Sequence, residues 1–84
     1  MPFVYILRCR DGSLYTGAAK DLERRIAQHR AGVASKYTRA RLPVVVAFSR
    51  RVRTWSAALK EEARLKSLSR AEKLVLLKVS GVTR

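Results

Sequence analysis

The chain has 84 residues, 48% of them hydrophobic, and its 19 Lys and Arg against 6 Asp and Glu give a formal charge of +13. This length suits one small domain over residues 1–84, and hydrophobic residues spread along the whole chain exclude a disordered basic tail. We therefore expect a folded protein with a polyanionic partner, with DNA ahead of RNA and either of them ahead of an anionic membrane.

The single cysteine and the short apolar runs exclude several classes of protein. Cys9 is the single cysteine, so an intramolecular disulfide is excluded, and one cysteine with one histidine cannot form the usual four-ligand zinc site. The first apolar run ends at Arg8, which is too short for a signal peptide, and no run of 18 apolar residues follows. We expect a soluble cytoplasmic protein with no membrane segment and no obligate protein partner.

The first third of the chain predicts a β-hairpin. Residues 3–9, FVYILRC, are apolar and β-branched on both faces, which predicts a central strand. Asp11 and Gly12 are typical of a tight turn. A second strand is predicted over residues 14–16, and Gly17 is expected to end it and to leave room for another chain or a ligand to approach the backbone closely.

A helix and a long basic loop should follow the hairpin. Asp21 is a suitable N-cap for a helix over residues 22–30, with Gly32 as its C-terminal stop. Residues 31–43, AGVASKYTRARLP, are predicted to be irregular. Because cations alternate there with an aromatic residue, the loop suits a nucleic-acid backbone and an unstacked base.

The remaining residues predict one strand and two helices. A Val and Phe run over residues 43–49 predicts a strand that pairs with the hairpin. Ser56 is expected to cap the next helix, and neighbouring Trp55 to cover the edge of the core rather than to read a base. Ser69 and Glu72 form a capping box that opens a last helix. The predicted fold is α+β, a three-stranded antiparallel sheet flanked by helices in the order β-β-α-β-α-α.

Four polar side chains within residues 4–29 are predicted to converge on one groove. Tyr5 lies in the first strand and Tyr15 in the second, while Arg25 and His29 are four residues apart and so share a helix face. Taken singly, each has an ordinary structural alternative: a core tyrosine, a hairpin residue, a solvated charge and a partner of the helix dipole.

These residues carry a resemblance to a known family. Val4-Tyr5-Ile6 and Tyr15-Thr16-Gly17, joined by a hairpin and followed by AAKDLERRIAQH, resemble the paired motif of the GIY-YIG nuclease superfamily. Val4 stands where that motif has Gly, and Thr16 where it has Ile. The resemblance covers essentially the whole chain and is closest to the small stand-alone YhbQ-like (UPF0213) group, which has a KYTRAR-type loop and a short helical C-terminus.

The resemblance implies a phosphodiesterase site with one divalent ion, Mg²⁺ or Mn²⁺. Carried over by position, the catalytic residues are Tyr5, Tyr15, Arg25, His29 and Glu62. The resemblance implies that Tyr5 accepts the proton of the attacking water, with its pKa lowered by the metal. Arg25 would clamp the phosphate, while Tyr15 and His29 would orient water and phosphate. Whether Tyr5 or His29 is the general base stays open at this point.

Glu62 is the implied metal ligand. It is preferred over Glu61 because Ala58-Leu59-x-x-Glu62 matches the family's helix pattern, and its alternative is a surface ion pair with Lys66. One carboxylate can hold Mg²⁺ or Mn²⁺ when water and substrate oxygens complete the octahedron. Many relatives also have a late asparagine near the site, and this sequence has no Asn.

Three functions follow from these observations. The first is a metal-dependent endonuclease on DNA, structure-selective and related to DNA repair, that binds chiefly through phosphate contacts. The second is a catalytically weak nucleic-acid-binding module of the same fold, and the third a basic protein associated with RNA or ribosomes. The residues expected to contact nucleic acid are Lys20, Arg24, Lys36, Tyr37, Arg39 and Arg41.

Overall fold

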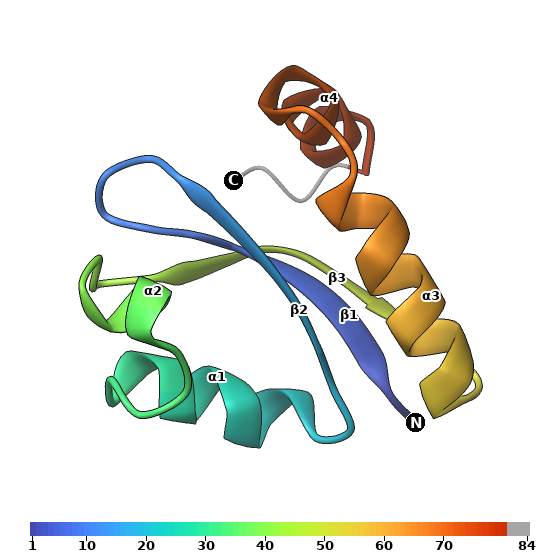
Figure 1. Cartoon of the computed structure of the whole chain (residues 1–84), viewed down its shortest axis with the longest axis horizontal. Coiled ribbons are helices and arrows are strands. Elements are labelled where there is room, and N and C mark those ends of the chain that lie inside the picture. Colours follow the sequence, from blue (N-terminus) through green and yellow to red (C-terminus); the bar gives the residue numbers. More distant parts are fainter. Residues whose placement is uncertain (81–84) are drawn as a thin grey trace.

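The computed structural model describes residues 1–80 and shows a three-stranded antiparallel sheet with helices on both faces (Figure 1). The strand order is β2-β1-β3 for β1 (Phe3–Arg8), β2 (Leu14–Ala19) and β3 (Val45–Arg51). The helices are α1 (Leu22–Arg30), α2 (Lys36–Arg39), α3 (Trp55–Lys66) and α4 (Arg70–Ser80). The α+β class and the predicted order of strands and long helices are confirmed, with the short helix α2 added.

The central strand β1 divides the core into two clusters. Val4 and Ile6 pack with α3 and α4 on one face of the sheet, while Tyr5 and Leu7 pack toward α1 on the other. This is the alternation that its apolar residues on both faces predicted. The prediction of a central strand is confirmed, and Tyr5 is thereby held within the core by both sheet neighbours.

The hairpin is confirmed, but its second strand is longer than predicted. β2 continues through Gly17 to Ala19, with Gly17 opposite Tyr5 in the β1 register. Gly17 was expected to end the strand because glycine is a common breaker. It stays in the strand because its missing side chain leaves space for the Tyr5 ring.

The α1 prediction is confirmed at both ends. The Asp21 side chain accepts a hydrogen bond from the Arg24 N–H at 3.1 Å, and Gly32 follows the helix with a φ of 79°. The prediction that residues 31–43 are irregular is wrong over α2. Ser35 caps this single turn by accepting from the Tyr37 N–H at 3.1 Å, a local signal outweighed in the sequence by the surrounding basic and small residues.

The third strand is shifted toward the C-terminus relative to residues 43–49. Pairing with β1 begins at Val45 opposite Arg8, because Pro43 has no N–H for the ladder. The register slips between Ile6 and Leu7, which leaves Ala47 as an extra residue on β3. The strand then continues to Arg51, whose pairing with Phe3 outweighs the polar composition there.

For the last two helices, the predicted N-cap of α3 is wrong and the predicted capping box of α4 is right. Thr54, not Ser56, caps α3, and its side chain accepts from the Ala57 N–H at 3.0 Å. In α4 the capping box is confirmed: the Ser69 N–H donates to Glu72, and the Glu72 N–H donates to Ser69. None of the helices within residues 1–80 combines the length and apolar character that crossing a membrane requires.

Candidate active site

Tyr5 is the buried centre of the site, and Gly17 makes its position possible. A Cβ atom added to Gly17 would lie 2.5 Å from Tyr5 Oη and 2.6 Å from its Cζ, well inside van der Waals contact. Any side chain at position 17 would therefore displace the phenol. The close approach expected at this glycine is made by the protein's own tyrosine.

A hydrogen-bonded chain leads from Tyr5 through His29 to Thr38. Tyr5 Oη lies 2.8 Å from His29 Nε2, and His29 Nδ1 lies 2.8 Å from Thr38 Oγ1. Thr38 in turn donates to the Ser35 carbonyl over 3.4 Å. Since the Thr38 proton is used there, we assign the ring proton of His29 to Nδ1, which makes Nε2 the acceptor of the Tyr5 hydroxyl.

Burial keeps both ends of the central hydrogen bond uncharged. It raises the pKa of Tyr5 far above its ordinary range, and the nearby Tyr15 and Glu62 raise this pKa further while Arg25 opposes them. His29 is fully buried, and its pKa is lowered by burial and then by the Arg25 charge. At neutral pH the pair is therefore a phenol donating to a neutral imidazole.

Tyr15 and Arg25 complete the group on the α1 side of the sheet. The Tyr15 ring meets the His29 ring edge-on, with centroids 5.2 Å apart, and it is only half-buried. Arg25 is also half-buried, and its charge acts on both Tyr5 and His29. The predicted convergence of Tyr5, Tyr15, Arg25 and His29 is thus seen in the structure.

The two neighbouring glutamates of α3 have different surroundings. Glu61 forms ion pairs with Arg50 and Arg64, each at 2.7 Å. Glu62 pairs with Lys66 at 3.0 Å, and its charge contributes to the raised pKa of the Tyr5 phenol. Of the two carboxylates, Glu62 is the one whose charge acts on Tyr5.

The donor set around Glu62 fits a hydrated hard cation rather than an all-protein metal cage. Within the described residues no group of three or more His, Cys, Asp or Glu side chains could hold an ion. A single carboxylate is sufficient for Mg²⁺ or Mn²⁺, since these ions keep several waters and take substrate oxygens as ligands. The Glu62 side chain is 19% exposed, so it can reach such an ion once Lys66 moves aside.

Four of the six residues expected to contact nucleic acid are exposed cations, which fall into two pairs. Lys20 and Arg24 line a cavity beside Arg25, whereas Lys36 and Arg39 are exposed on and around α2. Thr38 points inward from the same short helix to His29. The α2 cations therefore lie on the helix that holds His29 without belonging to the Tyr5–His29 pair.

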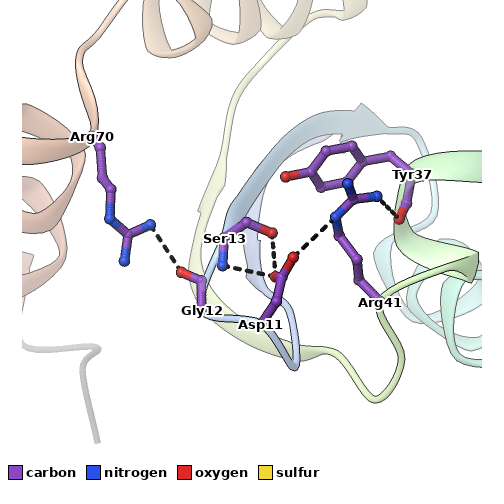
Figure 2. A network of polar contacts seen from close by, with 6 residues as sticks. All are labelled: Asp11, Gly12, Ser13, Tyr37, Arg41 and Arg70. Atoms are coloured by element: carbon purple, nitrogen blue, oxygen red, sulfur yellow. Dashed lines mark hydrogen bonds and ion pairs between the residues drawn. The ribbon is translucent and has the colours of Figure 1, made fainter.

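Tyr37 and Arg41 are engaged within the protein. The Arg41 guanidinium lies 3.8 Å from the centroid of the Tyr37 ring, donates to the Tyr37 carbonyl and pairs with Asp11 in the hairpin turn (Figure 2). The Tyr37 ring also stacks on Tyr15 at 5.9 Å. Arg70 reaches the same turn from the other side through the Gly12 carbonyl. This network fixes the loop against the hairpin.

Two residues near the site were not selected from the sequence. Thr38 sits inside the basic KYTRAR segment, where nothing in one sequence relates it to His29. Trp55 was expected to cover the core edge, but it is exposed and lines the cavity that Arg25 also lines. The available signal was its position as a lone aromatic between cations.

The fold and this residue set correspond to a known class. Residues 1–74 match the model of the GIY-YIG catalytic domain. The chain therefore belongs to the GIY-YIG family, a nuclease family whose domains act on nucleic acids, and the resemblance noted in the sequence is confirmed.

Its relatives place it more narrowly beside the UPF0213 proteins. The chain is 48% identical over 75 residues to a UPF0213 protein of Staphylococcus saprophyticus. The aligned region covers 89% of this chain and 92% of that protein. It is 47% identical over 76 residues to a UPF0213 protein of Staphylococcus aureus, at 90% and 93% coverage.

Two solved structures share the fold. The solution NMR structure of a UPF0213 protein from Bacillus halodurans has a TM-score of 0.64 and 40% identity, covering 96% of this chain and 87% of that one. The NMR structure of a protein from E. faecalis has a TM-score of 0.63 and 37% identity, at 98% and 88% coverage.

Proposed function

We propose that the protein is a divalent-metal-dependent endonuclease that hydrolyses phosphodiester bonds in DNA. The observation that carries the proposal is the buried Tyr5–His29 hydrogen bond, with the charges of Arg25 and Glu62 both acting on Tyr5. Membership of the GIY-YIG family supplies the nuclease class, and the formal charge of +13 supports a nucleic-acid substrate.

The hydrogen-bond directions support a two-proton relay. Tyr5 takes a proton from the attacking water while its own proton passes to His29 Nε2, so that no free phenolate forms. The water oxygen bonds to phosphorus, the bond to the leaving oxygen breaks, and that alkoxide takes a proton from solvent. Both ring nitrogens of His29 are already hydrogen-bonded, to Tyr5 and to Thr38, so we assign His29 as the second member of the relay.

Charge on the phosphate is balanced by the remaining residues. Arg25 offers a planar fork of donors to the non-bridging oxygens, and half-buried Tyr15 orients the phosphate or the water beside it. Glu62 would hold Mg²⁺ or Mn²⁺, which when bound supplies Lewis-acid polarisation of the phosphate. Because Lys66 forms an ion pair with Glu62 in the structure, a metal ion would compete with Lys66 for this carboxylate.

Cleavage of plasmid and branched DNA in Mg²⁺, Mn²⁺ or EDTA tests the proposal. We expect metal-dependent nicking that Glu62→Gln abolishes, while binding to DNA is retained. Glu61→Gln is the matched control, since it removes the neighbouring carboxylate and only exposed ion pairs, and it should cleave like the parent. Tyr5→Phe should lower the rate about 10²–10⁴-fold.

The alternative is a catalytically weak module that binds nucleic acid through the same surface. The Glu62–Lys66 ion pair favours it, because a carboxylate held by Lys66 is less available to a metal. Salt-sensitive binding of DNA with no cleavage in any metal would establish the module and reject the nuclease. Preference for RNA over DNA in the same binding assay would favour the third function considered above.

A further inference from the structure

A cavity of about 340 Å³ lies next to the catalytic group, between the start of α1 and the start of α3. Its size is at the lower end of ligand pockets, which measure about 300–1,000 Å³. Arg25 lines it together with Lys20, Arg24, Gln28 and Trp55. Arg25, which is proposed to hold the scissile phosphate, therefore also lines this cavity.

Trp55 gives the cavity an aromatic face that the protein covers only in part. It is 36% exposed at the first position of α3, and the Thr54 cap fixes the start of this helix. Lys20 lies over the Trp55 ring, with Nζ 5.3 Å from the ring centroid. Because the lysine side chain is flexible, Lys20 can move to a phosphate when a nucleobase stacks on Trp55 in its place.

The second exposed aromatic ring among the described side chains is Tyr37, at 38%, but its ring is occupied by Arg41 and Tyr15. The stacking role expected of the basic loop therefore suits Trp55 better. Gln28 adds an amide that can both donate to and accept from the polar edge of a base.

We infer that this cavity is a subsite for one unstacked nucleobase, which stacks on Trp55 while the phosphate beside it sits at Arg25. Both faces of a base are covered inside a duplex, so this subsite accepts a base from single-stranded, frayed or branched DNA and not from regular duplex. The inference rests on the proposed function in taking the phosphate at Arg25 as the scissile one. Base stacking and flanking cations are together the usual means of binding single strands.

The chain contains one tryptophan, so fluorescence excited at wavelengths that tyrosine does not absorb reports this ring alone. The intact protein in EDTA would be titrated with a single-stranded oligonucleotide, with the same oligonucleotide carrying abasic sites, and with a blunt duplex. We expect strong quenching by the normal single strand and weak quenching by the other two. Because EDTA prevents cleavage, this readout is independent of nuclease activity.

The second part of the test compares the affinities of variants for single-stranded DNA, measured by fluorescence anisotropy of a labelled oligonucleotide. Trp55→Ala should weaken single-strand binding about tenfold, and Trp55→Phe should recover much of it. Leu59→Ala is the matched control, because Leu59 is an exposed apolar residue one turn further along α3 and lies outside the cavity. It should bind like the parent.

The inference is overturned if duplex quenches as strongly as single strand, or if Trp55→Ala binds single strand like the parent protein. Its failure differs from failure of the proposed function. A protein that shows the stacking signature but never cleaves DNA would keep the subsite and lose the nuclease, whereas a Trp55-independent nuclease would do the opposite.

Discussion

Thr38 decides which nitrogen of His29 carries the ring proton. Its hydroxyl is the acceptor for Nδ1, and this leaves Nε2 to accept the Tyr5 proton. Thr38 touches neither substrate nor water in the proposed reaction, so it is a positioning residue. Its contribution lies in keeping the imidazole in the one tautomer that suits a relay from Tyr5.

Thr38→Val should destabilise the protein and loosen this tautomer. Valine removes the acceptor and leaves the buried Nδ1–H of His29 without a partner, which costs about 1–3 kcal/mol. Urea unfolding measures the loss, and ¹⁵N NMR of the single histidine reports the tautomer. Thr38→Ser should keep the Nδ1–H form. A Val variant with an unchanged ring spectrum would contradict the assignment.

The lowered pKa of His29 predicts how stability depends on pH. The unfolded chain binds a proton at its histidine below about 6.5, whereas the folded protein resists protonation to a lower pH. The free energy of unfolding should therefore fall as the pH is lowered from 7.5 to 5.5.

Urea unfolding of the parent and of His29→Gln at these two pH values measures this effect. The variant should show much less change between them. Carboxylates such as Asp11 and Glu72, whose pKa values are lowered, begin to lose their contribution only below about pH 5, outside this window. Equal slopes in both proteins would show that His29 is not the group responsible.

At the scale of elements, α3 brings two different functions to one side of the tyrosine site. Its first residue is Trp55, and two turns later it carries Glu62. Both depend on where the helix starts, and Thr54 sets this start by accepting from the Ala57 N–H. A hydroxyl residue at position 56 offered the sequence a competing cap, but it lies inside the first turn.

Thr54→Ala should lower the free energy of unfolding by about 1 kcal/mol, because it removes the acceptor for an N–H at the helix start. Ser56→Ala is the control and should be close to neutral, since alanine is the better helix former at a position already inside the helix. Thermal or urea unfolding separates the two variants. A larger loss from Ser56→Ala would contradict the observed cap.

Element boundaries also show how far local patterns determine the fold. The hairpin turn, the Asp21 cap and the Ser69–Glu72 box depend on neighbouring residues, and all three were predicted. The extension of β2 past Gly17 was missed, since it depends on a ring from another strand. The helix α2 was missed because one turn has no periodicity to detect.

On the scale of the whole molecule, exposed cations lie on several elements, and some of them flank the tyrosine site. Lys20, Arg24, Lys36 and Arg39 are exposed around α1 and α2. Arg41 is different because Asp11 already neutralises it. Affinity for DNA should therefore be largely electrostatic and steeply salt-dependent.

Replacing both Lys36 and Arg39 with alanine should reduce the slope of log affinity against log salt. For single strands each phosphate contact contributes about 0.7 to this slope, so the double variant should lose about 1.4. Lys78→Ala removes a cation from α4, on the opposite face of the sheet, and serves as the control. Equal slopes for the parent and the double variant would remove α2 from the binding surface.

The sequence by itself determined the class of the fold, the central strand and the hairpin, because these depend on local turn, cap and periodic patterns. It also determined the family, because the family motifs lie within short segments of the chain. It also picked out Tyr5, Tyr15, Arg25 and His29, which fall within one short unit of the chain. Only the tertiary structure decided that the charge of Glu62 acts on Tyr5, that Thr38 holds His29, and that Trp55 lines a cavity with Arg25. The reason is physical: contacts between residues far apart in the chain form when helices pack on a sheet, and helix spacing alone does not say which side chains will then meet.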